Sequence, residues 1–206
     1  MCSGCRARHA LAIARCTGCA IGVPAGTTRC GACLGAPLPL STTVVAVDYG
    51  FPWSGLVSAF KFHAALDLAG PMADLLAAAV RARTEERPDC VLPIPLGRSR
   101  LAERGMNQAW ELARRVAPRL GCAADAHLLV RHVETPHLAD LPREARAQAI
   151  RGAFVLAPGA STRLRGRSLA LVDDVMTTGA TAVEAARTLL AAGATSVQLW
   201  AFARTP

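Results

Sequence analysis

Short apolar runs alternate along this chain with stretches in which apolar residues recur at helical spacing. The runs have the length and aliphatic character of buried strands, whereas the spaced stretches are typical of amphipathic helices. The predicted strands are Thr43–Val47, Cys90–Leu96, Leu128–Val130, Ala153–Leu156, Leu169–Val172 and Ser196–Ala203. Together with the helices they follow the order β-α-β-α-β-β-α-β. This order predicts an α/β fold with a mostly parallel sheet and helices on both faces.

Helices are predicted between these strands. The first begins within Leu56–Phe62 and carries Lys61, and the second, Pro71–Arg83, has proline in its first turn. An amphipathic helix follows Asn107, and another follows residue 181. A lysine on such a helix face is usually solvated, and the alternative is that Lys61 contacts a ligand.

The segment Leu169–Thr181, LALVDDVMTTGAT, carries the clearest chemical signal. Its apolar run ends at Asp173 and Asp174, where we expect the strand to stop. Gly179 allows the backbone to turn sharply and to approach a ligand closely. Threonines surround this glycine and offer hydroxyl groups, namely Thr177, Thr178 and Thr181. The segment therefore predicts a strand, a tight loop and a helix.

The residue types in this loop indicate a phosphorylated sugar. The N-terminus of a helix presents unpaired N–H groups and partial positive charge, so a phosphate fits there. Two carboxylates would repel a phosphate, but they suit the hydroxyls of an attached sugar, directly or through magnesium. The predicted ligand is a ribose phosphate. The alternative is an acid pair that only caps a helix. No P-loop motif GxxxxGK[ST] is present.

The same segment resembles the phosphoribosyl-pyrophosphate (PRPP) motif of type I phosphoribosyltransferases. That motif consists of an apolar strand, two acids, two small aliphatic residues and a loop rich in Thr, Ser and Gly. The resemblance implies that Asp173 and Asp174 hold the ribose hydroxyls. It also implies that the 5-phosphate is bound by Val175, Met176, Thr177, Thr178, Gly179, Ala180 and Thr181.

Length and charge limit the fold and the partners. A chain of 206 residues with 52% hydrophobic residues can form one α/β domain with a small appendage. The net charge of +8 and the pI near 9.6 favour anionic partners weakly. The first residues lack the apolar core of a secretory signal, and no stretch is long and apolar enough to span a membrane. We therefore expect a cytoplasmic protein without a membrane partner.

Six of the eight cysteines form three C-x-x-C pairs within the first 33 residues. In a cytoplasmic chain such pairs indicate zinc rather than disulfides, and two pairs can supply four thiolates to one tetrahedral ion. Because a segment this short has almost no hydrophobic core, the metal would organise its fold. The alternative is that one pair acts as a redox thiol.

Proline and arginine follow the second predicted strand. Cys90–Leu96 ends in Pro-Ile-Pro, which cannot continue strand pairing and predicts a rigid loop at the carboxyl edge of the sheet. The basic residues near that edge are Arg98, Arg100 and Arg104. The long polar segment Arg131–Gly152 is predicted to be a basic lid over the site. The alternative for both segments is a solvated surface loop.

The chain as a whole resembles the ComF family, in which a cysteine ribbon precedes a type I phosphoribosyltransferase domain. The resemblance is carried by the ribbon cysteines and by LVSAFKFH, LPIPLGRSRLAERGMNQAWELA, RHVETPHLADLPREARAQAIRGAF and LALVDDVMTTGAT. It implies a ribbon over residues 1–36 and a transferase-like domain over residues 43–206. The implied zinc ligands are Cys16, Cys19, Cys30 and Cys33. Cys2 and Cys5 are then half of a second site, a replacement for Cys16 and Cys19, or a remnant.

The resemblance also implies roles for further residues. Asp173, Asp174 and Arg131 are the catalytic candidates, with Arg131 and the lid closing over the ligand. The groups expected to hold the pyrophosphate together with magnesium are Ile94, Pro95, Leu96, Arg98 and Arg104.

Three functions remain open from the sequence. The first is transfer of a phosphoribosyl group from PRPP to an acceptor that the sequence does not identify. The second is a competence factor for DNA uptake in natural transformation, which binds single-stranded DNA or helicase proteins and takes PRPP or a nucleotide only as a ligand. The third is a salvage transferase for a purine or pyrimidine base, although no base pocket is identifiable.

Overall fold

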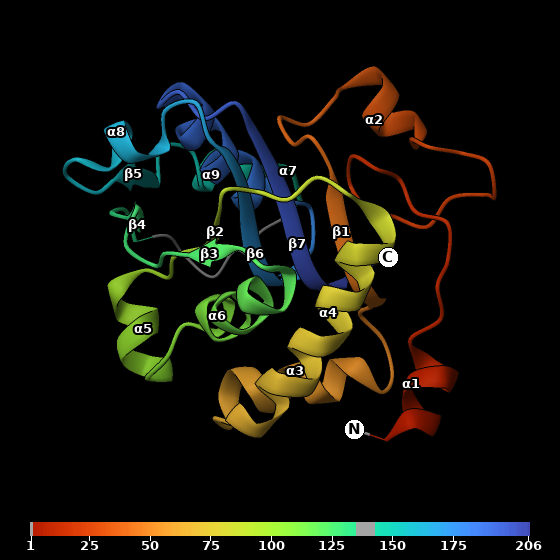
Figure 1. The fold of residues 1–206 in the computed structure, drawn as a ribbon. Helices are drawn as coiled ribbons and strands as arrows, with labels where there is room; N and C mark the ends of the chain where they lie inside the picture. The colour runs from red at the N-terminus through yellow and green to blue at the C-terminus, as the bar shows by residue number, and fades with distance from the viewer. Residues whose placement is uncertain (1, 135–142) are drawn as a thin grey trace.

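A parallel sheet forms the centre of the molecule (Figure 1). The computed structural model describes residues 2–134 and 143–206. All neighbouring strands of this five-stranded sheet run parallel. In spatial order the strands are β1 (Thr43–Asp48), β7 (Ser196–Arg204), β6 (Ser168–Met176), β2 (Cys90–Pro93) and β3 (Ala123–Ala124). The predicted α/β class and parallel sheet are confirmed.

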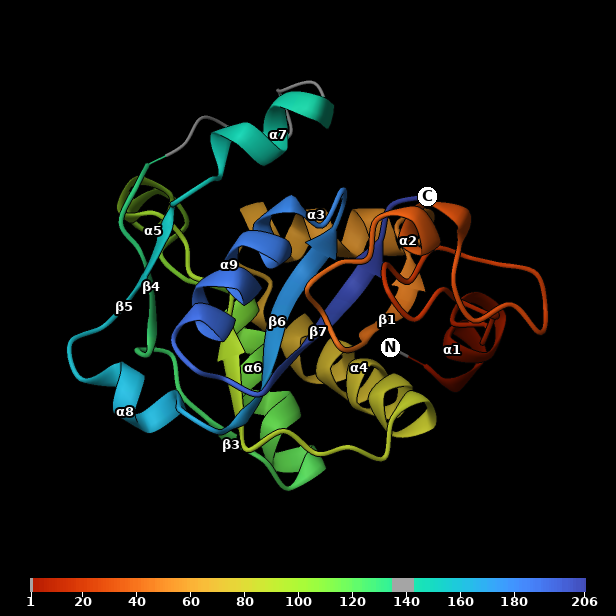
Figure 2. The same cartoon turned by 90° about the horizontal axis from the view of Figure 1, so that it is seen from above.

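Helices cover both faces of the sheet, as the view from above shows (Figure 2). One face carries α3 (Trp53–Phe62), α4 (Ala69–Arg83) and α6 (Gln108–Leu120), and a short 3₁₀ helix, η1 (Leu66–Leu68), joins α3 to α4. The other face carries α9 (Ala180–Ala191). Leu112, Ala113 and Val116 of α6 are buried against the sheet, because their spacing places them on one side of the helix.

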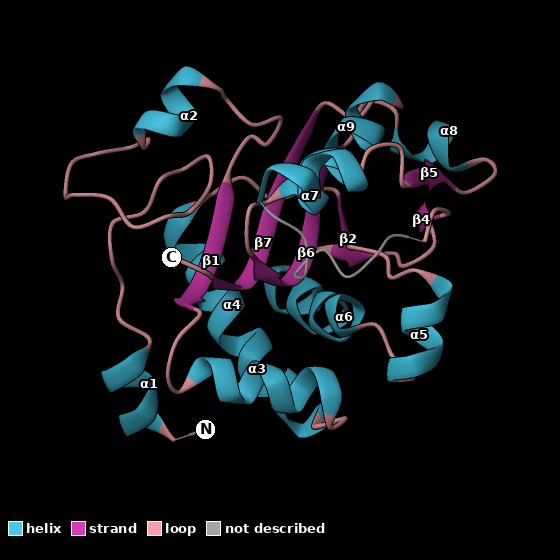
Figure 3. Cartoon of the chain, turned by 180° about the vertical axis from the view of Figure 1, so that it is seen from behind, coloured by secondary structure: helices cyan, strands magenta, loops and turns pink. Residues whose placement is uncertain are grey.

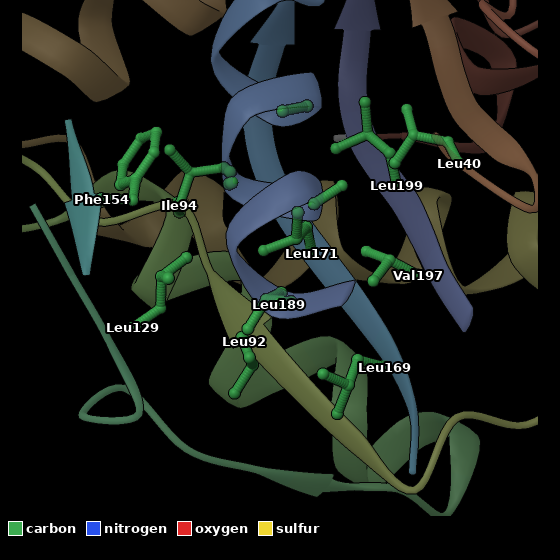
Figure 4. Close-up of a cluster of buried hydrophobic side chains, with 14 of the residues drawn as sticks. Leu40, Leu92, Ile94, Leu129, Phe154, Leu169, Leu171, Leu189, Val197 and Leu199 are labelled. Atoms are coloured by element: carbon green, nitrogen blue, oxygen red, sulfur yellow. The ribbon is translucent and has the colours of Figure 1, made fainter. Parts of the chain in front are cut away.

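Two apolar clusters, one on each face, hold the layers together. Leu169 and Leu171 of β6 belong to the cluster under α9, which Figure 4 shows, and Ala170 and Val172 belong to the opposite cluster. Alternate side chains of a strand point to opposite faces, so this continuous apolar run is buried on both sides. Trp200 of β7 is fully buried in the second cluster and contributes one of the few aromatic side chains to the core.

Two predicted strands lie outside the main sheet. β4 (Leu129–Arg131) and β5 (Phe154–Leu156) pair antiparallel with each other and form a separate ribbon. The predicted sheet is mostly parallel, and these two predicted strands are the part of the chain that does not join it. In each, the central residue is exposed while a flanking residue is buried, so only one side of the ribbon is packed. The place beside β2 is taken instead by the two residues of β3, which are too few to give a sequence pattern.

Two boundaries also differ from expectation. The motif strand does not stop at the acid pair: β6 continues to Met176, because it pairs with β7 along its whole length. The basic stretch after β2 is the helix α5 (Arg98–Arg104) and not a loop. Of the predicted lid, residues 135–142 lie outside the described residues, and the helix α7 (Arg143–Ala149) follows them. The helix α8 (Ala160–Leu164) leads from β5 into β6.

The cysteine-rich segment lies beside the edge strand β1 (Figure 3). It contains two short helices, α1 (Ser3–His9) and α2 (Gly31–Gly35), and is otherwise irregular. Among the described residues, no helix has the length and apolar character needed to cross a membrane.

Candidate functional site

A cleft of about 410 Å³ opens at the carboxyl ends of β6 and β2. This volume lies within the range of small-molecule sites, roughly 300–1,000 Å³. Open parallel sheets commonly bind ligands at this edge, where loops and helix N-termini meet. Basic side chains outnumber acidic ones in its lining: Lys61, Arg100, Arg104 and Arg131 against Asp173 and Asp174.

The acid pair of β6 lines this cleft. Asp174 is only 6% exposed, and its Oδ1 lies 3.0 Å from Nζ of Lys61 on α3. Asp173 is partly exposed, and its Oδ1 accepts the backbone N–H of Asp174 at 2.8 Å. Both carboxylates line the cleft, as the motif predicts, but one of them already has a cation beside it.

The environment of the pair disfavours full ionisation. Desolvation, followed by the charge of Asp174, raises the pKa of Asp173 to about 7, and the nearby Lys61 ammonium opposes this rise. Adjacent carboxylates with little access to water cannot both carry charge at low cost. A bound cation or a set of hydroxyl donors would relieve this cost. The pair is therefore suited to bind such groups.

The threonine turn forms one end of the cleft. Gly179 has a φ of +79°, and a Cβ there would lie 2.6 Å from Cε of Met176, so this position requires glycine. The helix α9 begins directly after it, and Thr178 Oγ1 accepts the N–H of Ala180 at 3.3 Å. Turn and helix N-terminus together present N–H groups suited to an anion.

The predicted phosphate-binding residues divide into groups. Val175, Thr177 and Thr181 line the cleft. Met176 is 2% exposed and belongs to the core. Thr178 and Ala180 line a neighbouring cavity that also touches α7.

The arginines of α5 are sorted by helical geometry. Arg100 and Arg104 line the cleft, whereas Arg98 begins the helix, is exposed and is not among the lining residues. Residues four apart lie on the same side of a helix, and residues two apart do not. Ile94 and Leu96 also line the cleft, while Pro95 between them is buried. Arg100 thus lies where the sequence analysis expected Arg98.

Arg131 reaches the cleft from the β4–β5 ribbon. It is 7% exposed, its guanidinium lies 5.9 Å from the ring centroid of Phe154, and its Nε donates to Val133 O at 3.4 Å. Burial, together with the charge of Arg100, lowers the pKa of Arg131. Two guanidiniums that face one cavity and destabilise each other's charge favour an anion between them.

Several lining residues were not among the predicted site residues: Tyr49, Phe62, Asn107, Gln108 and Thr205. Asn107 gave a usable signal, because an Asn before an amphipathic run indicates an N-cap, and its Oδ1 does accept the N–H of Trp110 at 3.2 Å. Tyr49 and Thr205 follow predicted strands without any motif, and Phe62 lies in the LVSAFKFH segment, to which the sequence analysis gave no site role. Only the fold brings them to the cleft.

The four cysteines of the predicted metal site lie together. The Sγ atoms of Cys16, Cys19, Cys30 and Cys33 are all within 4.8 Å of one another. Cys19 Sγ and Cys30 Sγ are 3.6 Å apart, close to the roughly 3.8 Å between sulfurs of a tetrahedral zinc thiolate site with bonds of about 2.3 Å. The donor set and geometry therefore fit a structural metal ion. Cys2, the N-cap residue of α1, and Cys5 within α1 are exposed and lie outside this cluster.

Curated relatives match nearly the whole chain. DNA utilization protein YhgH of Salmonella typhi is 35% identical over 211 residues, which cover 100% of this chain and 90% of the relative. The protein of the same name from Escherichia coli K12 is 33% identical over 190 residues, which cover 89% of this chain and 82% of the relative. Competence protein F of Haemophilus influenzae is 31% identical over 208 residues, covering 99% and 90%. A comparison with models of protein families finds no match.

Solved structures show only a distant likeness. The glutamine PRPP amidotransferase from B. subtilis, complexed with ADP and GMP, is 18% identical with a TM-score of 0.43, covering 65% of this chain and 26% of that one. Adenine phosphoribosyltransferase from Leishmania tarentolae is 14% identical with a TM-score of 0.43, covering 76% and 74%. These scores are too low to support a conclusion about a ligand. The site rests on its own geometry.

Proposed function

The chain belongs to the ComF family, which includes competence protein F and DNA utilization protein YhgH, and on this premise we propose that its cleft binds PRPP with magnesium. The observation that carries the proposal is the composition of the cleft. It is lined by an acid pair, by threonines of the turn before the helix α9, and by guanidiniums from α5 and β4. These groups match the sugar hydroxyls, the 5-phosphate and the pyrophosphate of one molecule.

Each part of the ligand has its own residues in this proposal. Asp173 and Asp174 accept hydrogen bonds from the ribose hydroxyls, while Thr177, Thr181 and the turn amides hold the 5-phosphate. Arg100, Arg104 and Arg131 face the pyrophosphate, since they line the cleft. Asp173 and Asp174 are the carboxylates that would hold magnesium with the ligand, and the ion would supply positive charge against the pyrophosphate beyond that of the arginines.

The chemistry that this arrangement supports is phosphoribosyl transfer. A nucleophile forms a bond to C1 of the ribose, the bond from C1 to the pyrophosphate oxygen breaks, and its electron pair leaves with pyrophosphate. Positive charge develops on the sugar during this step, so carboxylates nearby stabilise it. The protein contributes position and charge more than proton transfer. The acceptor is the unknown part of the reaction.

Zinc is the metal that we propose for the four cysteines. Thiolates in a closed tetrahedral set are typical of structural zinc, which supplies folding free energy to a segment with little core. Elemental analysis of the purified protein should find about one zinc per chain. A protein without metal whose residues 1–36 are folded would contradict this assignment.

Isothermal titration tests the ligand. PRPP should bind only with magnesium present, and the double variant Asp173→Asn with Asp174→Asn should lose at least tenfold in affinity, because hydrogen bonds to charged groups contribute about 1.5–3 kcal/mol each. Asp67→Asn is the matched control, since Asp67 is exposed and outside the cleft. Equal affinity of the double variant and the wild type would reject the assignment. Pyrophosphate release against bases, amines and ammonia then tests for an acceptor.

The names of the relatives favour a second candidate, a competence factor for DNA uptake. In this function the cleft takes PRPP or a nucleotide as a ligand, and the outer surface of this basic chain contacts single-stranded DNA or a helicase partner. The net charge of +8 supports contact with nucleic acid. A cytoplasmic location suits both functions.

A further inference from the structure

Three successive carbonyl groups join the Cys16/Cys19 pair to the sheet. Thr17 O accepts the N–H of Thr43 at 2.8 Å, and Gly18 O accepts the Thr43 hydroxyl at 2.6 Å. Cys19 O accepts from Nε of Arg204 at 2.9 Å. Thr17 and Gly18 lie between the two cysteines, and the third carbonyl belongs to Cys19 itself. The loop that would hold the metal is therefore fixed to β1 and to the end of β7.

Arg204 also contacts the residue directly before the threonine turn. Its Nη1 lies 3.4 Å from Met176 O, to which it donates, and the N–H of Thr205 donates to the same carbonyl at 3.1 Å. Met176 is the last residue of β6, and Thr177 directly after it lines the cleft. The backbone O of Arg204 accepts the N–H of Tyr49 at 2.7 Å, and Tyr49 and Thr205 also line the cleft.

We propose that Arg204 is a positioning residue that couples the cysteine loop, residues 16–19 with two of the metal-binding thiols, to the threonine turn, residues 177–181. One guanidinium bridges Cys19 O of the loop and Met176 O at the base of the turn. The role of the turn in binding PRPP rests on the proposed function, but the bridge does not depend on which ligand the cleft takes.

The physical basis is the cost of a buried charge. Arg204 is 6% exposed, so its charge needs its hydrogen-bond acceptors: Cys19 O for Nε, and Met176 O together with the carbonyl and hydroxyl oxygens of Thr205 for Nη1. Loss of Cys19 O would leave the buried Nε–H without this acceptor. The cysteine loop has almost no core of its own, so removal of the metal releases Cys19 O. Arg204 can then shift, and Met176 O loses its guanidinium donor while it keeps the N–H of Thr205. By linkage, a ligand that holds the turn must raise the affinity of the cysteines for the metal.

Hydrogen exchange of the full-length protein tests the bridge without any ligand. Arg204→Met keeps the apolar stem and should raise amide exchange of residues 177–181 about tenfold with zinc still bound. Arg167→Met is the matched control on an exposed arginine. Thr43→Val removes the bond to Gly18 O but not the contact with Met176 O, so it should speed zinc release and leave exchange at 177–181 unchanged while zinc is bound.

Equilibrium competition with a chromogenic zinc chelator tests the coupling. In the wild type, saturating PRPP with magnesium should raise severalfold the chelator concentration that removes half of the zinc, and in Arg204→Met this rise should disappear, which a purely structural role would not produce. Unchanged exchange at 177–181 in Arg204→Met or in zinc-stripped wild type, or a protein without metal at the four cysteines, would overturn the proposal. If wild type does not bind PRPP, the proposed function fails, and the exchange data alone decide whether the bridge exists.

Discussion

Two neighbouring aspartates in β6 experience different surroundings. Asp174 is nearly buried and faces Lys61 at 3.0 Å, whereas Asp173 is partly exposed and has a pKa raised to about 7. Lys61 is therefore the cation in contact with the acid pair and the largest influence that favours its ionisation. The sequence analysis left its contact with a ligand open, and the structure adds a contact with the acid pair that the helical pattern could not reveal.

Replacing Lys61 should raise the pKa of Asp173 above about 7, because the ammonium opposes the rise more strongly than the Asp174 N–H or the charge of Arg104. Between the ordinary 3.8 and the raised pKa, the folded protein holds a proton that the unfolded chain has lost. The stability from this proton is present at low pH and is lost as the pH rises through the raised value. Lys61→Met should shift that loss to higher pH.

The carboxyl carbon shift of Asp173, followed by NMR across pH, measures this change. Lys61→Arg is the control, because it retains a positive charge at the same position. A pKa of Asp173 in Lys61→Met that equals or falls below the wild-type value would contradict the proposed role of the lysine.

The junction of β2, α5 and α6 determines which cations face the cleft. Because residues 98–104 form a helix, Arg100 and Arg104 share one side, and Arg104 lies 5.1 Å from the ring centroid of Phe62 at the rim. Asn107 then starts α6, and its Nδ2 donates to Ile94 O at 3.1 Å in the loop after β2. One side chain thus joins the helix N-terminus to the rigid proline loop.

Asn107→Ala should lower the free energy of unfolding by about 1–2 kcal/mol, because it removes a helix cap and a donor to a loop carbonyl. Asn107→Ser is the matched variant, since serine caps a helix well but is too short to reach Ile94 O. It should recover about half of the loss. Urea unfolding measures both variants, and an Asn107→Ala protein as stable as wild type would refute this account.

At the scale of the whole molecule, the cysteine segment and the sheet are in direct contact. Arg15 of that segment pairs with Asp48 of β1 at 2.7 Å, and Nη2 of Arg83 in α4 donates to Ile13 O at 2.6 Å. The metal site therefore adjoins the edge of the sheet, and the cleft opens at the carboxyl ends of the strands. A partner that binds the cysteine segment would contact the same body that holds the cleft.

If the family's link to DNA extends to this protein, binding of single-stranded DNA should weaken steeply with salt. Several phosphate contacts would cost on the order of 10³ in affinity between about 50 and 200 mM salt, because each contact releases counterions. Fluorescence anisotropy with a labelled oligonucleotide measures this slope. The Asp173→Asn, Asp174→Asn variant is the control and should bind equally if the outer surface is used. Absent or salt-insensitive binding would count against the competence function.

Much of the chemistry could be predicted from contiguous residues. The strand, acid pair and threonine turn of the motif are neighbours in sequence, and a local pattern therefore specifies which groups one sheet edge presents. The same holds for the cysteine pairs, whose spacing indicates a metal before any fold is known. The predicted α/β class and parallel sheet followed from alternating strand and helix patterns, and both are confirmed.

The remainder depended on contacts between distant segments. Lys61 beside Asp174, Arg131 beside Arg100, and Arg204 between Cys19 and Met176 are separated by many residues, so no local pattern encodes them. Short apolar runs such as Leu129–Arg131 have the same composition whether they join the main sheet or a separate ribbon. The sequence by itself determined the kinds of groups and the fold class, because these follow from local spacing. Tertiary packing alone decided which charges meet, because burial and pairing depend on what the rest of the chain places beside them.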